Sequence, residues 1–293
     1  MKFVDIKNDV AFRKIFGNES RKEALISFLN AILLLQNDKK IVSVDILTPY
    51  QLPEIKGGKV TIVDVKALDQ TGKNYIVEMQ VADYDNFDKR VLYYASKSYS
   101  SQIERGDLFE KLNPTFFIGI LDFVVTKNTD YISRHKIIDI VTGENFIKDI
   151  EFHFIELPKF KKTENQLTSI IEQWVYFIKN AEDLVLIPES VKDIGLKFAY
   201  ENADKHNWTK EELAAYDYVF MREQEERSKF KFALRNAVKS EVKKALKSGI
   251  ETGISKYQKK VANNLLQMGI SIKDTAKGTG LSIEQVTKLK TWK

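Results

Sequence analysis

Two neighbouring stretches of the chain, 60–66 and 75–80, are rich in β-branched and apolar residues. The segment between them, 69–73, contains the Asp and Gly residues that tight turns favour. This pattern predicts a β-hairpin. If the turn is symmetric about Thr71, Asp64 lies directly opposite Glu78 on the neighbouring strand.

The remaining pattern divides into a mixed first part and a helical second part. Apolar spacing predicts a helix or helix pair over 8–35 and another helix over 85–105. After residue 162 the spacing is helical to the end of the chain. We therefore expect an α/β fold with an all-α C-terminal extension, organised as 1–162, 163–250 and 251–293. Strands are expected at 41–47, 60–68, 74–81, 115–125, 135–140 and 150–157.

The two opposed acids of the predicted hairpin need a partner. Directly opposed residues have Cβ atoms roughly 4.5–5.5 Å apart, and like charges there are destabilising. A Mg²⁺ ion bound by both Asp64 and Glu78 would remove this repulsion. Lys66 and Gln80 follow on the same faces, which places a cation and an amide beside the acids. The alternative is a solvated sheet face on which Lys66 pairs with the acids, although apolar residues flank them there.

Six short segments resemble those of a known family. They occur in the order found in the recombination-promoting nuclease/transposase family, which is part of the PD-(D/E)XK nuclease superfamily. One such segment is weakly specific, but six in order are specific together, and the similarity spans most of the chain. The segments are Asn8–Gly17, Ile26–Leu33, Val77–Gln80, Lys89–Tyr94, Ile120–Phe123 and Ile155–Phe160.

The resemblance implies a restriction-endonuclease-like mixed sheet flanked by helices within 1–162. It also implies a Mg²⁺-dependent DNA endonuclease, with Mn²⁺ as a substitute ion, linked to DNA recombination or transposition. Asp64 and Glu78 match the metal-binding acids of the family. Asp9 matches an acid near the start of the first helix, although an acid there also suits a helix N-terminus. A second metal ion would require Asp9.

Gln80 departs from the superfamily motif, in which a lysine is usual. A lysine would stabilise negative charge on the attacked phosphate, whereas a glutamine can only orient a water. Lys66, or Lys14 from the first predicted helix, is then a candidate source of the charge. Arg90 is a secondary candidate, because helical spacing sets it apart from the apolar face of the helix predicted over 85–105.

The amino-acid composition argues against several classes of catalytic and metal-binding site. The 293 residues include no cysteine and only three histidines, which argues against disulfides, thiolate zinc sites and a Ser-His-Asp triad. No secretory signal and no apolar run of about 18 residues is visible, so we expect a cytoplasmic protein with no membrane partner. The net charge of +5 is mild, which makes local clusters of charge more informative than the total.

Such a basic cluster lies between residues 227 and 260, where it would neutralise DNA phosphates. Interleaved glutamates equally fit a solvated helix face. Region 251–293 has a helix-turn-helix pattern with a Ser282/Gln285 capping box. Its last helix would enter the major groove, or the same hairpin would form a homo-oligomer. The residues expected towards DNA are Gln285, Thr287, Lys288 and Lys290.

The combined interpretation is a metal-dependent DNA endonuclease that hydrolyses phosphodiester bonds. Its catalytic residues would be Asp64, Glu78, Gln80, Lys66 and Asp9. The alternative is a catalytically inactive DNA- or protein-binding module that keeps the nuclease fold. The sequence leaves open whether DNA or RNA is cleaved.

Overall fold

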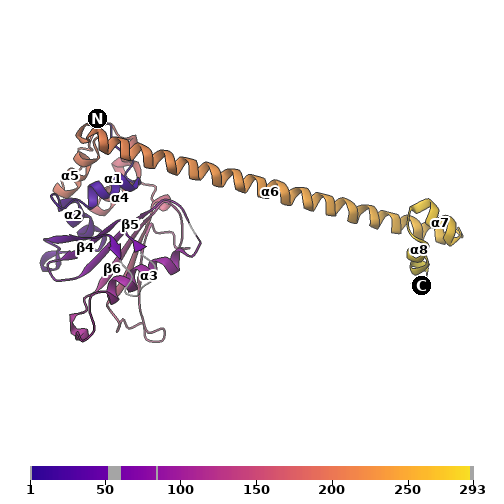
Figure 1. The fold of residues 1–293 in the computed structure, drawn as a ribbon, viewed down its shortest axis with the longest axis horizontal. Helices are drawn as coiled ribbons and strands as arrows, with labels where there is room; N and C mark the ends of the chain where they lie inside the picture. Colours follow the sequence, from indigo (N-terminus) through magenta and orange to yellow (C-terminus); the bar gives the residue numbers. More distant parts are fainter. Residues whose placement is uncertain (1, 52–60, 84, 291–293) are drawn as a thin grey trace. The chain divides into compact units, whose positions relative to one another are not determined.

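A mixed six-stranded sheet forms the centre of the fold in the computed structural model, which describes residues 2–51, 61–83 and 85–290 (Figure 1). The strand order is β1-β4-β5-β6-β8-β7, and β2 and β3 form a separate two-stranded sheet. The strands are β1 (Val44–Leu47), β2 (Tyr50–Gln51), β3 (Thr61–Ile62), β4 (Val65–Asp69), β5 (Asn74–Gln80), β6 (Thr115–Leu121), β7 (Ile132–Lys136) and β8 (Ile150–Glu156).

Strand direction brings several strand ends to one edge of the sheet. Strands β5, β6 and β8 are parallel, while β4 runs antiparallel to β5. The carboxyl ends of the three parallel strands therefore lie at the same edge as the start of β4. Open α/β sheets commonly bind ligands at such an edge.

Helices cover both faces of this sheet. Helix α3 (Phe87–Ser100) connects β5 to β6 and packs on one face through Val91 and Ala95. Four other helices share the larger apolar core on the opposite face. These are α1 (Asp9–Phe16), α2 (Glu23–Ile32), α4 (Ile170–Asn180) and α5 (Ile194–Ala203). A mixed sheet flanked by helices confirms the expected α/β fold class.

The β4–β5 hairpin has the register expected from its turn. Val65 pairs with Val77, and Leu68 pairs with Asn74. Gly72 adopts a φ of +83°, which a glycine tolerates without strain. The Asp69 carboxylate closes the turn by accepting the Thr71 N–H at 2.7 Å. The turn thus sets the register symmetrically about Thr71.

The strand expected over 60–68 is interrupted before β4. Strand β3 ends at Ile62 and β4 begins at Val65, which leaves Asp64 in a bend; Val60 lies outside the described residues. The Asp64 side chain accepts the N–H of Met79 at 2.9 Å. This side-chain bond replaces continued ladder pairing at the start of β4.

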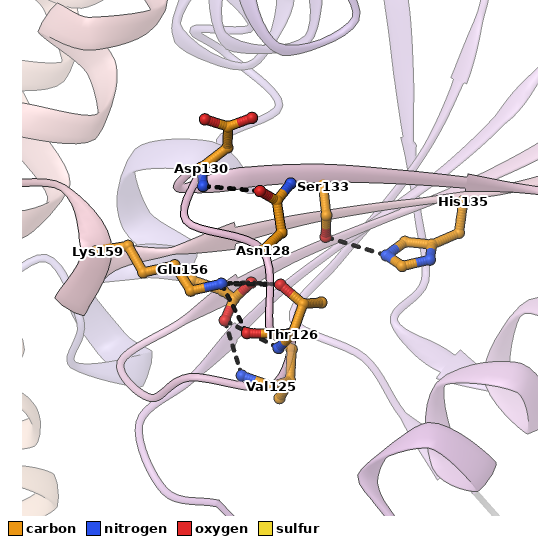
Figure 2. Close-up of polar contacts among 8 residues, drawn as sticks. All are labelled: Val125, Thr126, Asn128, Asp130, Ser133, His135, Glu156 and Lys159. Atoms are coloured by element: carbon orange, nitrogen blue, oxygen red, sulfur yellow. Dashed lines mark hydrogen bonds and ion pairs between the residues drawn. The ribbon is translucent and has the colours of Figure 1, made fainter.

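A buried ion pair fixes the chain that follows β6 (Figure 2). Glu156 is fully buried and accepts hydrogen bonds from the Val125 N–H at 2.7 Å and the Thr126 hydroxyl at 2.6 Å. Lys159 lies 2.9 Å from the same carboxylate and also donates to the Thr126 carbonyl at 2.9 Å. The cluster is satisfied internally, so we assign it a structural role.

The chain divides into two compact units, Met1–Met221 and Arg222–Lys293. Helix α6 (Lys210–Gln267) contributes residues to both units, and a Thr209/Glu212 capping box opens it. The second unit also contains α7 (Ile272–Thr279) and α8 (Ile283–Lys290) around a small apolar core. Residue 250, the expected end of the accessory region, lies within α6, and the three-region division stays a prediction. None of the helices described is long and apolar enough to cross a membrane.

Candidate active site

Asp64 and Glu78 meet where β4 begins and β5 ends. Extending the observed register by one position places Asp64 opposite Glu78, as the sequence predicts. The main-chain N–H of Asp64 donates to Glu78 Oε1 at 3.2 Å. In return, Asp64 Oδ2 accepts the N–H of Met79, the residue after Glu78. The two acids are therefore held together through the main chain.

Burial and mutual repulsion make this pair unfavourable when both acids are ionised. Burial raises the pKa of Glu78 well above its ordinary value, and the Asp64 charge raises it further. Burial also raises the pKa of Asp64, and the nearby Asp9 charge adds to the shift. Asp9 is the first residue of α1, behind the Asn8 N-cap. The charge of Asp64 thus acts on Glu78, and the charge of Asp9 acts on Asp64.

Arg13 is a site residue that the sequence interpretation missed. Its Nη2 and Nε atoms lie 3.0 Å and 3.3 Å from Asp64 Oδ1. This contact lowers the pKa of Asp64 in opposition to burial. The only local signal is that Arg13 lies one helical turn after Asp9 on α1, which puts both residues on one face of the helix.

The predicted lysines have different surroundings. The Lys14 side chain pairs with Glu212 and lies 5.0 Å from the centre of the Trp208 ring, so the structure assigns it to packing against the start of α6. Its expected role as a source of charge stays a prediction. Lys66 pairs with Ile76 across the hairpin and shares the sheet face of Glu78. Burial lowers the pKa of Lys66.

Gln80 and Arg90 form a second polar contact at the end of β5. Arg90 Nη2 donates to Gln80 Oε1 at 2.5 Å, and Gln80 Nε2 donates to the Ala82 carbonyl at 3.0 Å. The Arg90 charge reaches the acid pair, because it lowers the pKa of Glu78 against the upward shift from burial. Both residues thus lie at the predicted site.

The acid pair fits a hard divalent cation. Mg²⁺ is typically bound by one or two carboxylates, with waters and substrate phosphates completing its shell. Asp64 and Glu78 supply two mutually repelling carboxylates at a sheet edge, and Arg13 and Arg90 offset their charge only in part. Within residues 2–51, 61–83 and 85–290, no group of three or more Asp, Glu, His or Cys side chains is arranged to hold a metal. The protein would therefore share the coordination shell with water and substrate.

A second candidate surface lies in the Arg222–Lys293 unit. The Ser282/Gln285 capping box is present, with Ser282 N–H donating to Gln285 at 2.8 Å. On α6, Lys229 pairs with Glu225 and Lys244 with Glu241, so internal ion pairs accompany part of the basic cluster. The side chains of Arg227 and Lys290 lie outside the description. Within the basic cluster of residues 227–260, the basic residues described as exposed are Lys229, Lys231, Arg235, Lys239, Lys243, Lys244, Lys247, Lys256, Lys259 and Lys260.

The chain matches a known protein family over most of its length. The model of the PD-(D/E)XK nuclease family transposases matches residues 6–267, which include the sheet, α1 and the hairpin acids. Comparisons with curated proteins and with solved structures gave no significant match. The family match covers most of the 293 residues and indicates a nuclease- or transposase-related role. The chain belongs to the PD-(D/E)XK nuclease family transposases.

Proposed function

We propose that this protein is a Mg²⁺-dependent DNA endonuclease, with Mn²⁺ as a substitute ion, that acts in DNA recombination or transposition. The observation that carries the proposal is the Asp64–Glu78 pair, which is half-buried, mutually repulsive and fixed at the carboxyl edge of the sheet. Stability alone does not account for two such acids, because their charges oppose each other. A divalent cation shared with a DNA phosphate would give both a function.

Each site residue has a definite role in this proposal. Asp64 and Glu78 would hold the cation, and the Met79 N–H fixes the position of the Asp64 carboxylate. Asp9 adds negative charge on the α1 side, which favours cation binding. Arg13 offsets the negative charge of Asp64 and would contact a DNA phosphate. Lys66, on the same sheet face as Glu78, contributes a further cation beside the substrate.

The reaction would be hydrolysis of a phosphodiester. Mg²⁺, when bound, polarises a phosphate oxygen and makes a bound water more acidic. The water oxygen forms a bond to phosphorus while the ester P–O bond breaks. The proton lost by the water passes to solvent, and the leaving oxygen takes up a proton. The acid pair keeps water and phosphate together, which lowers the entropic barrier of the reaction.

Cleavage of supercoiled plasmid in Mg²⁺ and in EDTA tests this function. We expect the wild-type protein to nick the plasmid in Mg²⁺ but not in EDTA. We expect the Asp64→Asn and Glu78→Gln variants to lose this activity. Asp45→Asn is the matched control, because Asp45 is an exposed β1 acid that pairs only at 3.3 Å with Lys22. Absence of cutting by the wild-type protein, combined with DNA affinity that the site variants retain, would instead support a binding module.

A further inference from the structure

The orientation of the Gln80 carboxamide is fixed by its two partners. Arg90 can only donate hydrogen bonds, so the atom 2.5 Å from its Nη2 must be the carbonyl oxygen of Gln80. The main-chain carbonyl of Ala82 can only accept, so the Gln80 nitrogen must face it at 3.0 Å. Gln80 therefore holds a guanidinium, and its amide is not aimed at a water beside Glu78.

The position of Arg90 is unfavourable for helix stability. It lies in the first turn of α3, where its main-chain N–H donates to the Asn86 carbonyl. The positive end of the helix dipole disfavours a cation there. Two contacts offset this effect, namely the Gln80 oxygen and the Phe87 ring, whose centre is 5.8 Å from the guanidinium carbon. The structure thus places a positive charge beside the acid pair despite an unfavourable helix position.

A lysine at position 80 would not suit this arrangement. Its ammonium group would take the place of the Gln80 oxygen and face the Arg90 guanidinium. Two cations at such a short distance repel each other. Glutamine supplies the acceptor that Arg90 requires. The residue type at position 80 and the cation on α3 are therefore linked, since each suits the other.

We propose that Arg90 is the group that stabilises negative charge on the phosphate during cleavage, and that Gln80 is the positioning residue that holds it. The inference rests on the proposed nuclease function and deepens it. Arg90 takes over, from a helix, the charge that a strand lysine supplies in the superfamily motif. Its planar guanidinium is suited to two oxygens of one phosphate. Gln80 acts only through the orientation that it gives to Arg90.

An exchange of the two side chains tests this assignment. Single-turnover cleavage would be measured for Arg90→Gln, Gln80→Lys and the double variant that carries both changes. DNA affinity would be measured alongside by fluorescence anisotropy in Ca²⁺. We expect Arg90→Gln to slow cleavage about 100-fold, as loss of one transition-state donor does, with little change in affinity. Gln80→Lys is also slow, because its ammonium group repels Arg90.

The double variant is expected to recover about tenfold over the slower single variant, because its lysine no longer faces a guanidinium. Lys89→Gln is the matched control, since it removes an exposed cation from the same turn of α3. Arg90→Lys keeps the charge and guards against a folding defect in Arg90→Gln. A merely structural role for Arg90 would lower stability and DNA affinity together with the rate, whereas the proposed role lowers the rate with little change in affinity.

Three results would overturn the inference. Cleavage by the Arg90→Gln variant at the wild-type rate would show that Arg90 takes no part in the reaction. A double variant no faster than the product of the two single effects would show that the residues act independently. If the wild-type protein does not cut at all, the nuclease function fails and this inference fails with it. If the wild-type protein cuts DNA and either of the first two results is found, the nuclease function stands and only the role of Arg90 fails.

Discussion

The guanidinium of Arg13 on α1 lies 3.0 Å from Asp64 Oδ1 at the start of β4. This contact joins the first helix to the hairpin across 51 positions of the chain. It also places a protein cation on an oxygen that a metal ion would use. Arg13 and the metal therefore compete in part for the same charge.

Replacing Arg13 tests this competition. Arg13→Gln is expected to bind Mg²⁺ roughly two- to fivefold more tightly at pH 8, because a half-exposed ion pair of modest strength no longer opposes the metal. Isothermal titration calorimetry measures the difference. Arg21→Gln serves as the control, since the Arg21 side chain is about as exposed as that of Arg13 and pairs with Glu201 at 3.6 Å. Unchanged or weaker binding by Arg13→Gln would show that the two cations do not compete.

Glu78→Gln is expected to stabilise the protein in EDTA while it removes cleavage. The folded state raises the pKa of Glu78, so ionised Glu78 destabilises the fold above that pKa and this effect disappears as the pH falls. Glutamine removes the charge and keeps the oxygen that accepts the Asp64 N–H. We expect a gain of about 1 kcal/mol in the free energy of unfolding, or about 2–4 °C in Tm.

Added Mg²⁺ provides the complementary measurement. The ion should raise the Tm of the wild-type protein, because it binds only the folded site. It should have no such effect on Glu78→Gln. A lower Tm for Glu78→Gln in EDTA would mean that the ionised carboxylate contributes favourably to the fold.

The buried ion pair of Figure 2 is expected to be sensitive to removal of one partner. Glu156→Ala leaves Lys159 and two main-chain N–H groups without their acceptor, and should lower the free energy of unfolding by about 3–5 kcal/mol. Urea denaturation measures the change. Glu241→Ala breaks an exposed pair on α6 and should stay within about 0.5 kcal/mol. Equal effects in the two variants would contradict the structural role of Glu156.

His153 on β8 should make stability depend on pH. Burial lowers the pKa of His153 to about 4, although Glu151 at 3.5 Å opposes the shift and Arg134 adds to it. The unfolded chain binds this proton below about pH 6.5, whereas the folded chain binds it only near 4. Stability from neutral His153 is present above pH 6.5 and is lost as the pH falls towards 4.

A matched variant isolates this dependence from other groups. His153→Phe should reduce the loss of stability between pH 6.5 and 4 by up to about 1.4 kcal/mol per pH unit. Chemical denaturation at several pH values gives both slopes. Identical slopes for the wild-type and variant proteins would show that His153 does not titrate as described.

The hairpin shows why part of the site was predictable. Its register depends on a short turn with Gly72 at positive φ, and local sequence specifies such a turn. The opposed positions of Asp64 and Glu78 follow from that register. The bend at Asp64 was not predictable, because it depends on the bond between its side chain and the Met79 N–H.

Contacts between distant elements account for the rest. Periodicity indicates which face of α1 is apolar, but it does not reveal that Arg13 reaches Asp64 while Lys14 pairs with Glu212. Those partners depend on how helices pack against the sheet. The link between Gln80 and Arg90 likewise arises only when α3 folds over β5.

A titration with Mn²⁺ that follows both bound metal and plasmid cleavage tests the shared metal site most directly. Electron paramagnetic resonance reports the bound ion, and gel analysis reports the cut DNA. We expect cleavage to rise with occupancy of a site that requires both acids, and we expect Asp64→Asn and Glu78→Gln to lose bound Mn²⁺ and cleavage together. Cleavage that persists in either variant, or that starts before any Mn²⁺ is bound, would contradict the assignment of this pair as the metal-binding catalytic site.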